Sequence, residues 1–143
     1  MTTITRRFRI DAGHRVYGHE GKCAALHGHS FLIEVTVTAP DLDKLGRIVD
    51  FSVLKDRFGS WLEKEWDHGF LYWAADTELY LIFNEGPLSK YKSFKLPYNP
   101  TAENLSRYLL EHSEDILGWT NRELRVSKVV VWETENCRAE SSL

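Results

Sequence analysis

The sequence has 143 residues, of which 43% are hydrophobic and 27% charged, and this composition excludes a collagen-like, low-complexity or disordered chain. At this length folding buries roughly 68–70% of the surface of the unfolded chain, so one domain with one core is expected over residues 1–143. Eighteen Lys and Arg against 21 Asp and Glu give a net charge of −3, which disfavours nucleic acid or an anionic membrane as a partner.

The small number of cysteines indicates that the protein resides in a reducing compartment. Cys23 and Cys137 are too few to hold a secreted disulfide scaffold, so a reducing environment is expected. The first residues carry charge without a following apolar stretch, and no window approaches the roughly 18 apolar residues of a membrane span. We therefore predict a cytoplasmic protein.

The first 38 residues predict two strands. Residues 2–12 mix Ile4, Phe8 and Ile10 with Thr and Arg, and end at a turn-like Asp-Ala-Gly. Residues 30–38 alternate strictly between two sets of side chains, which is typical of a half-buried strand. The apolar face of this second strand consists of Phe31, Ile33, Val35 and Val37.

Two amphipathic helices are predicted further along the chain. Between residues 52 and 66 the apolar side chains recur at steps of three and four, so one face of this helix is apolar. A second helix is predicted to begin at Asn99-Pro100-Thr101 and to run to Leu117, because Pro suits a first helical turn and Asn or Thr can cap it.

The remaining segments are a weakly patterned region and a third strand. Residues 69–98 mix apolar side chains with Gly and Pro, and they predict a short helix near 74–83 followed by a loop. Residues 124–133 predict a strand, with room for only a short one after Asn136. One face of the strand at 124–133 is expected to hold Leu124, Val126, Val130 and Trp132.

Histidines are the densest group of residues that could carry chemistry. His27 and His29 project from the same face of an extended segment, and His14 reaches them if the first two strands are antiparallel. Three imidazole nitrogens favour zinc with a fourth position left open, the pattern of catalytic sites. His19 lies in the same region, so spacing alone does not decide which three histidines bind.

Cys23 allows two interpretations. It follows Gly21-Lys22, and a loop position beside a cation favours the thiolate, which can act as a base or a nucleophile. Its position four residues before His27 also allows it to be a fourth metal ligand, which would make the site structural. The sequence leaves both interpretations open.

Two further carboxylates have possible roles. Asp67 precedes His68, and a carboxylate can fix the tautomer of a histidine that relays protons, although a surface pair at a helix end is the alternative. Glu133 ends an apolar strand, where a carboxylate can accept two hydrogen bonds from the amidine-like edge of a pterin or guanine. An exposed glutamate at a strand edge is the alternative for Glu133.

Six sequence blocks together resemble the family of 6-pyruvoyl-tetrahydropterin synthases and 6-carboxytetrahydropterin synthases over nearly the whole chain. The blocks are FRIDAGH at 8–14, CAALHGHSF at 23–31, GRIVDF at 46–51, DH at 67–68, PTAEN at 100–104 and ET at 133–134. The resemblance implies an α+β tunnelling fold of order ββααββ, with two helices on one face of a four-stranded antiparallel sheet. It also implies a β-barrel formed by several subunits, in a homohexamer of two stacked trimers with active sites between subunits.

The same resemblance implies roles for individual residues. The zinc ligands are matched by His14, His27 and His29. Cys23 matches the general base, Asp67 and His68 the partners in proton transfer, and Glu133 the carboxylate that anchors the pterin. A further site-proximal segment that would contact substrate is matched by Thr101 and Glu103.

The implied reaction starts from 7,8-dihydroneopterin triphosphate. The compact Cys-x-x-x-His-Gly-His spacing at 23–29 is similar to the carboxy-type enzymes, which release acetaldehyde and triphosphate and make 6-carboxy-5,6,7,8-tetrahydropterin for queuosine synthesis. A pyruvoyl-type enzyme, which only eliminates triphosphate, and a non-catalytic zinc-containing pterin-binding relative are the alternatives. The segment Trp66–Tyr72 departs from the family pattern, so contacts to the substrate tail are expected to differ there.

Overall fold

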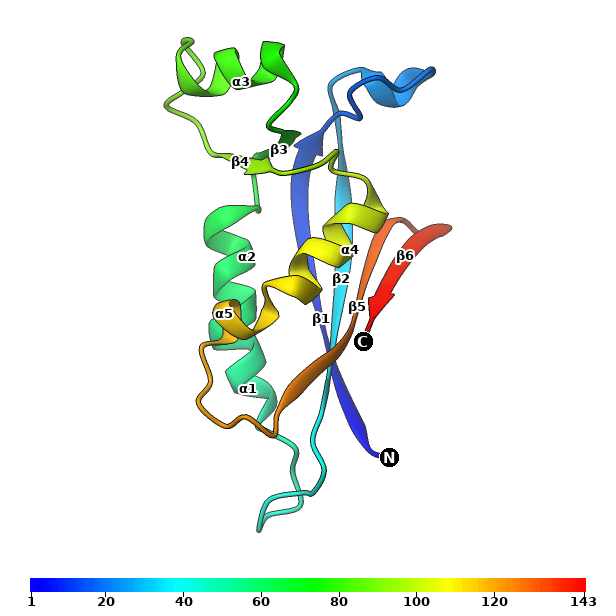
Figure 1. The fold of residues 1–143 in the computed structure, drawn as a ribbon, viewed down its shortest axis with the longest axis vertical. Helices are drawn as coiled ribbons and strands as arrows, with labels where there is room; N and C mark the ends of the chain where they lie inside the picture. The colour runs from blue at the N-terminus through cyan, green and yellow to red at the C-terminus, as the bar shows by residue number, and fades with distance from the viewer.

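A computed structural model describes residues 1–143 and contains one six-stranded mixed sheet (Figure 1). The strands are β1 (Thr3–His14), β2 (His27–Thr38), β3 (Phe70–Trp73), β4 (Ser93–Leu96), β5 (Arg125–Thr134) and β6 (Cys137–Ser142). Their order across the sheet is β4-β3-β1-β2-β5-β6. Strands β1, β2, β5 and β6 pair antiparallel, whereas β3 and β4 are parallel to β1.

The helices lie mostly over one face of this sheet (Figure 1). They are α1 (Phe51–Val53), the π-helical segment η2 (Leu54–Gly59), α2 (Ser60–Glu65), α3 (Thr77–Asn84), α4 (Ala102–Glu111), α5 (Ser113–Leu117) and the 3-10 turn η1 (Lys22–Ala24). Asp50 caps α1 and Thr101 caps α4, each by accepting a backbone N–H with its side chain. No helix has both the length and the apolar character needed to cross a membrane.

The longest strand pair decides which side chains meet. β1 and β2 pair without interruption from Thr3 opposite Thr38 to His14 opposite His27. On the face that the helices cover, β1 presents Ile10, Ala12 and His14. On β2, Phe31 and the other apolar residues predicted from the alternation are buried in the same core. The core therefore continues directly into a row of histidines at one end of the sheet.

The predicted α+β tunnelling fold is confirmed, with its four antiparallel strands and two helical stretches. The sheet is nevertheless wider than the four strands predicted, because β3 and β4 extend it beside β1. The prediction of a loop after residue 83 is wrong for residues 93–96, which form β4. Each of these two strands has four residues, too few for a readable alternation.

The predicted face of the strand at 124–133 is wrong in its second half. Val37 pairs with Val126 but Thr36 pairs with Lys128, so Ser127 is an extra residue in β5. A β-bulge of this kind shifts the alternation by one position. Val129 and Val131, rather than Val130 and Trp132, therefore join the core.

Candidate metal and catalytic site

Three of the six histidines converge where β1 and β2 meet the β1–β2 loop. One ligand nitrogen from each of His14, His27 and His29 lies within 4.8 Å of the other two. His14 is fully buried and the other two are half-buried. His19 is outside the group, and its Nδ1 accepts the Gly21 N–H at 2.8 Å. The structure thus selects among the four candidate histidines.

Backbone carbonyls orient two of these rings. His14 Nδ1 lies 2.7 Å from the Pro100 oxygen, and His27 Nδ1 lies 2.7 Å from the Ala25 oxygen. A carbonyl can only accept, so each Nδ1 carries the proton and each Nε2 presents a lone pair. The Nε2 atoms of His14 and His29 are buried and have no hydrogen-bond partner. Buried nitrogens without a partner fit a metal ion, which would satisfy them.

The protonation state of the rings also suits a metal. Burial lowers the pKa of His14, against the opposing effects of Pro100 and Glu133. Burial likewise lowers the pKa of His29. Neutral imidazole is the form that binds metal ions, so these pKa shifts keep the ligands available at lower pH.

Glu133 lies at the histidine cluster itself. Its Oε1 is 3.3 Å from His14 Nε2 and 3.4 Å from His29 Nε2, and its side chain is 29% exposed. The alternative of a solvent-exposed glutamate at a strand edge is therefore wrong. Because of the bulge in β5, Glu133 shares the helix-covered face with Val131 and with the histidines.

Cys23 is close to the histidines in sequence but does not join their group. It is a free, half-buried thiol in η1, within the loop that joins β1 to β2. Its sulfur is not among the converging ligand atoms. This placement argues against a closed site with Cys23 as the fourth ligand and leaves the thiol available for chemistry.

The Asp67–His68 pair is docked on the edge of β1. The Asp11 N–H donates to Asp67 Oδ1 at 2.9 Å, and the His68 N–H donates to the Asp11 oxygen at 2.7 Å. Asp67 Oδ2 lies 2.9 Å from His68 Nδ1, so the two side chains contact each other as predicted. His68 has a left-handed backbone with φ of 58°. That conformation is uncommon outside glycine, and here it turns the ring outward, with 76% of the side chain exposed.

The pKa of Asp67 reflects these contacts. Burial alone would raise it, but hydrogen bonds from Asp11 and His68, with the charges of His68 and Lys92, leave the pKa below its ordinary value. Asp67 is therefore an anion that holds the His68 ring by Nδ1 and leaves Nε2 free for proton transfer.

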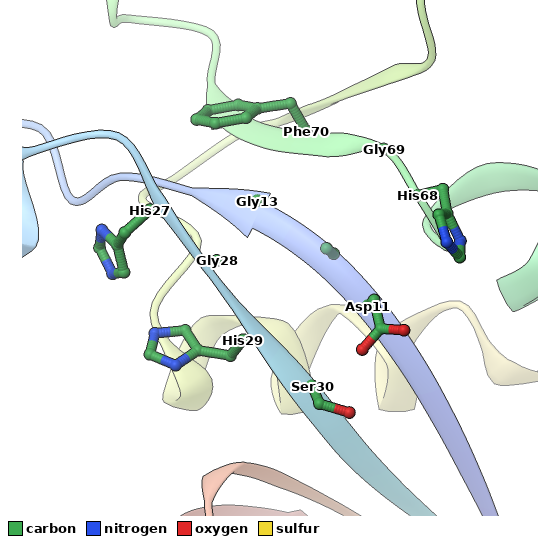
Figure 2. Close-up of a pocket in the computed structure, with 10 residues that line it drawn as sticks. Asp11, Gly13, His27, Gly28, His29, Ser30, His68, Gly69 and Phe70 are labelled. Carbon is green, nitrogen blue, oxygen red and sulfur yellow. The ribbon is translucent and has the colours of Figure 1, made fainter.

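The two groups approach the same end of the sheet from different sides (Figure 2). A hollow of about 620 Å³ is lined by Asp11, His68 and the segment 27–30. Neighbouring residues of a strand face opposite sides, so Asp11 points away from the face that holds His14. Figure 2 shows the rings of His27 and His29 on the side of β2 away from His68. Within one chain, His68 does not face the histidine cluster.

The predicted substrate segment begins α4. The Thr101 hydroxyl accepts the Asn104 N–H at 3.1 Å, so its first role is to cap the helix. Glu103 is exposed in the first turn of α4. The carbonyl of Pro100 joins this segment to His14, one of the three histidines that could hold a metal ion.

Sequence reasoning missed two anchors of the loop after His14. Asn99 accepts the Tyr17 N–H at 2.8 Å and donates to the Tyr17 oxygen at 3.0 Å, which ties the loop to the start of α4. Arg15 contacts buried Asp76 through two hydrogen bonds of 2.6 Å. The only local signal was the Asn-Pro pair, which predicted a helix cap and not a long-range contact.

Comparisons with known proteins identify the family of the chain. The family model described as 6-pyruvoyl tetrahydropterin synthase matches residues 3–142. A protein from Rickettsia bellii named 6-carboxy-5,6,7,8-tetrahydropterin synthase is 35% identical over 140 residues, covering 98% of this chain and 99% of the relative. A protein of the same name from Haemophilus influenzae is 31% identical, with 94% of each chain covered.

Solved structures agree with the fold. An uncharacterized protein from Wolinella succinogenes has a TM-score of 0.83 at 23% identity, covering 99% of this chain and 97% of its own. The 6-pyruvoyl tetrahydropterin synthase of Caenorhabditis elegans has a TM-score of 0.70 at 19% identity, covering 99% and 95% of the two chains. Since the family model spans nearly every residue and the curated relatives match over nearly their full length, the chain belongs to the 6-pyruvoyl tetrahydropterin synthase family of enzymes.

Proposed function

We propose that the protein is a zinc-dependent 6-carboxy-5,6,7,8-tetrahydropterin synthase. It would convert 7,8-dihydroneopterin triphosphate and one water into 6-carboxy-5,6,7,8-tetrahydropterin, acetaldehyde and triphosphate, a step toward queuosine and other 7-deazapurines. The convergence of His14, His27 and His29 carries the proposal, because three imidazole nitrogens that lie close together can hold one zinc ion beside the other predicted site residues. The names of the curated relatives support the carboxy-type product over the pyruvoyl-type product.

The three histidines would hold Zn²⁺ through their Nε2 atoms. The bound ion would polarise the vicinal hydroxyls of the substrate side chain and acidify the adjacent C–H. Cys23, as a thiolate outside the ligand group, would accept that proton. Glu133 would hold the pterin ring by its amidine-like edge, and Thr101 with Glu103 would form the neighbouring wall.

A second copy of the chain would complete the site. Asp67 orients His68 for proton transfer, but the sheet lies between His68 and the cluster of the same chain. The exposed His68 ring would therefore serve the histidine cluster of a neighbouring subunit. This requirement supports the predicted homohexamer, in which the sheets of several subunits join into a barrel.

Both cysteines are free thiols, which suits the reducing cytoplasm that we propose as the compartment.

A product assay tests the proposal. Purified protein with zinc is incubated with 7,8-dihydroneopterin triphosphate, and acetaldehyde and the pterin product are measured together. Equal amounts of acetaldehyde and 6-carboxy-5,6,7,8-tetrahydropterin are expected. Pyruvoyl product without acetaldehyde would assign the sister reaction. Pterin binding without any turnover would assign a non-catalytic relative.

A further inference from the structure

We propose that Lys92 is a positioning residue of the active site, which holds the Asp67–His68 pair from the start of β4. The inference rests on the proposed function, because it takes His68 as the group that transfers protons. It also gives a role to β3 and β4, which widen the sheet beyond the four strands predicted. The chain leaves β3 through α3 and returns in β4, beyond the C-terminal end of α2, and Lys92 is the last residue before β4 (Figure 1).

The ammonium group of Lys92 joins two backbone carbonyls at the end of α2. Its Nζ donates to the Glu63 oxygen at 2.8 Å and to the Asp67 oxygen at 2.5 Å. The Glu63 carbonyl belongs to the last turn of α2, where carbonyls lack partners within the helix and a cation interacts favourably with the helix dipole. The two contacts therefore hold the turn that leads from α2 into the Asp67–His68 pair.

The peptide that links Asp67 to His68 is held at both ends. Its oxygen accepts from Lys92 Nζ, and its N–H donates to the Asp11 oxygen at 2.7 Å. The peptide leads into the left-handed backbone of His68, which is unfavourable for a residue with a Cβ. Rotation of the peptide would break both hydrogen bonds, so they maintain the backbone conformation that turns the His68 ring outward.

The aliphatic part of the Lys92 side chain packs against Gly69. A Cβ at position 69 would lie 3.0 Å from both Cγ and Cδ of Lys92 and 3.1 Å from the Trp66 oxygen, closer than side chains normally approach. The Phe70 N–H also donates to the Lys92 oxygen at 3.2 Å. The lysine is thus held by its backbone, its stem and its ammonium group, although it lies at the surface.

The charge of Lys92 acts on the same pair. Burial opposes the ionisation of Asp67, but hydrogen bonds from Asp11 and His68 and the charges of His68 and Lys92 keep its pKa below the ordinary value. The Asp67 carboxylate in turn holds His68 Nδ1 at 2.9 Å. A misplacement of about 1 Å at a reacting group can cost about 100-fold in rate, so support of this kind matters for turnover.

The first test measures the local structure. Lys92→Met keeps most of the stem against Gly69 and removes the ammonium group. Lys90→Met is the matched control, because Lys90 is exposed and its Nζ lies over the Tyr91 ring. Amide hydrogen exchange is followed by mass spectrometry at single-residue resolution over residues 66–70. We expect the His68 N–H to exchange at least about tenfold faster in Lys92→Met and at the wild-type rate in Lys90→Met. Unchanged exchange in Lys92→Met would overturn the proposal.

The second test asks whether Lys92 acts through His68. In the wild-type background, Lys92→Met is expected to lower kcat by about 10–100-fold, with KM and bound zinc nearly unchanged. In the His68→Ala background the same substitution should change kcat by less than about twofold, because the group that Lys92 positions is gone. Equal fold losses in both backgrounds would show a general structural role and overturn the positioning of His68.

Failure of the proposed function gives a different result. Absence of turnover in the wild-type protein would remove the proposed function and, with it, the catalytic consequence of the Lys92 contacts. The exchange rate of the His68 N–H would still decide whether Lys92 holds the pair, because that measurement needs neither substrate nor turnover.

Discussion

His14 Nδ1 lies 2.7 Å from the carbonyl oxygen of Pro100, 86 positions along the chain. This contact sets the tautomer of the most deeply buried of the three candidate metal ligands, and it joins the start of α4 to the end of β1. Pro100 contributes through its backbone oxygen, which every residue type has, so this contact could not be predicted from the presence of a proline.

His27→Ala is expected to lose metal and activity together. The variant removes one of three converging nitrogens, and two imidazoles do not hold zinc against the surrounding water. Zinc per chain, measured by elemental analysis after dialysis, should fall from about one to below about one tenth. His19→Ala is the control, because His19 lies in the same loop outside the cluster. Equal zinc loss in both variants would contradict the assigned ligand set.

His68→Ala is expected to keep its zinc and lose turnover. The ring is exposed and remote from the histidine cluster of its own chain, so metal content and fold should not change. A positioned acid or base typically contributes 10²–10⁴-fold, and kcat should fall by about that factor with a smaller change in KM. His112→Ala serves as the control. Near-normal turnover in His68→Ala would remove this residue from the mechanism.

Mixing two inactive variants tests whether active sites lie between subunits. Cys23→Ala and His68→Ala each damage one half of the proposed site, and under the proposal the two halves come from different chains. After co-refolding at equal amounts, about one quarter of the sites should hold both native residues and recover activity. Activity equal to the sum of the separately refolded variants would show that each site is built from one chain.

Asp76→Ala is expected to destabilise the protein strongly. Asp76 is 1% exposed, pairs with Arg15 and caps α3 through the Leu79 N–H. Removing it leaves the partly exposed guanidinium of Arg15 with only its longer contact to Glu78, which costs about 1–3 kcal/mol of unfolding free energy. Urea unfolding measures the change. Glu111→Ala, which breaks an exposed ion pair with Arg107, is expected to leave stability unchanged. Similar losses of unfolding free energy in Asp76→Ala and Glu111→Ala would contradict the conclusion that the buried position of Asp76 makes its ion pair stabilising.

The acid stability of the protein should depend on Asp67. Its pKa is lower in the folded state than the ordinary value of 3.8, so the unfolded chain binds this proton more tightly. The stabilisation is complete above the ordinary pKa and is lost as the pH falls through the folded pKa. Urea unfolding from about pH 6 to about pH 2.5 should show the gap between wild type and Asp67→Asn closing in acid. Parallel curves would contradict the prediction.

Several features could be predicted from the sequence because they depend on near neighbours. The alternation at 30–38 identified the buried face of β2, and the spacing at 52–66 identified one continuous helical stretch. The His27-x-His29 pair shares a face in any extended conformation, so two of the three candidate metal ligands could be predicted directly. The contact of Asp67 with His68 was likewise local.

Only the tertiary structure decided how distant segments meet. Strict alternation from Val126 would turn Glu133 away from the histidines, whereas the extra residue at Ser127 turns it toward them. That bulge arises from pairing with β2, about 90 positions earlier, and no local pattern in β5 reports it. The separation of His68 from the three histidines is also a tertiary property. It depends on the hydrogen bonds between Asp11 of β1 and the Asp67–His68 turn that follows α2. The sequence by itself determined the ligand types and the periodicity of each element, because these are properties of neighbouring residues. Register and faces were settled by contacts across the sheet, because hydrogen-bond pairing between strands is a property of the folded chain.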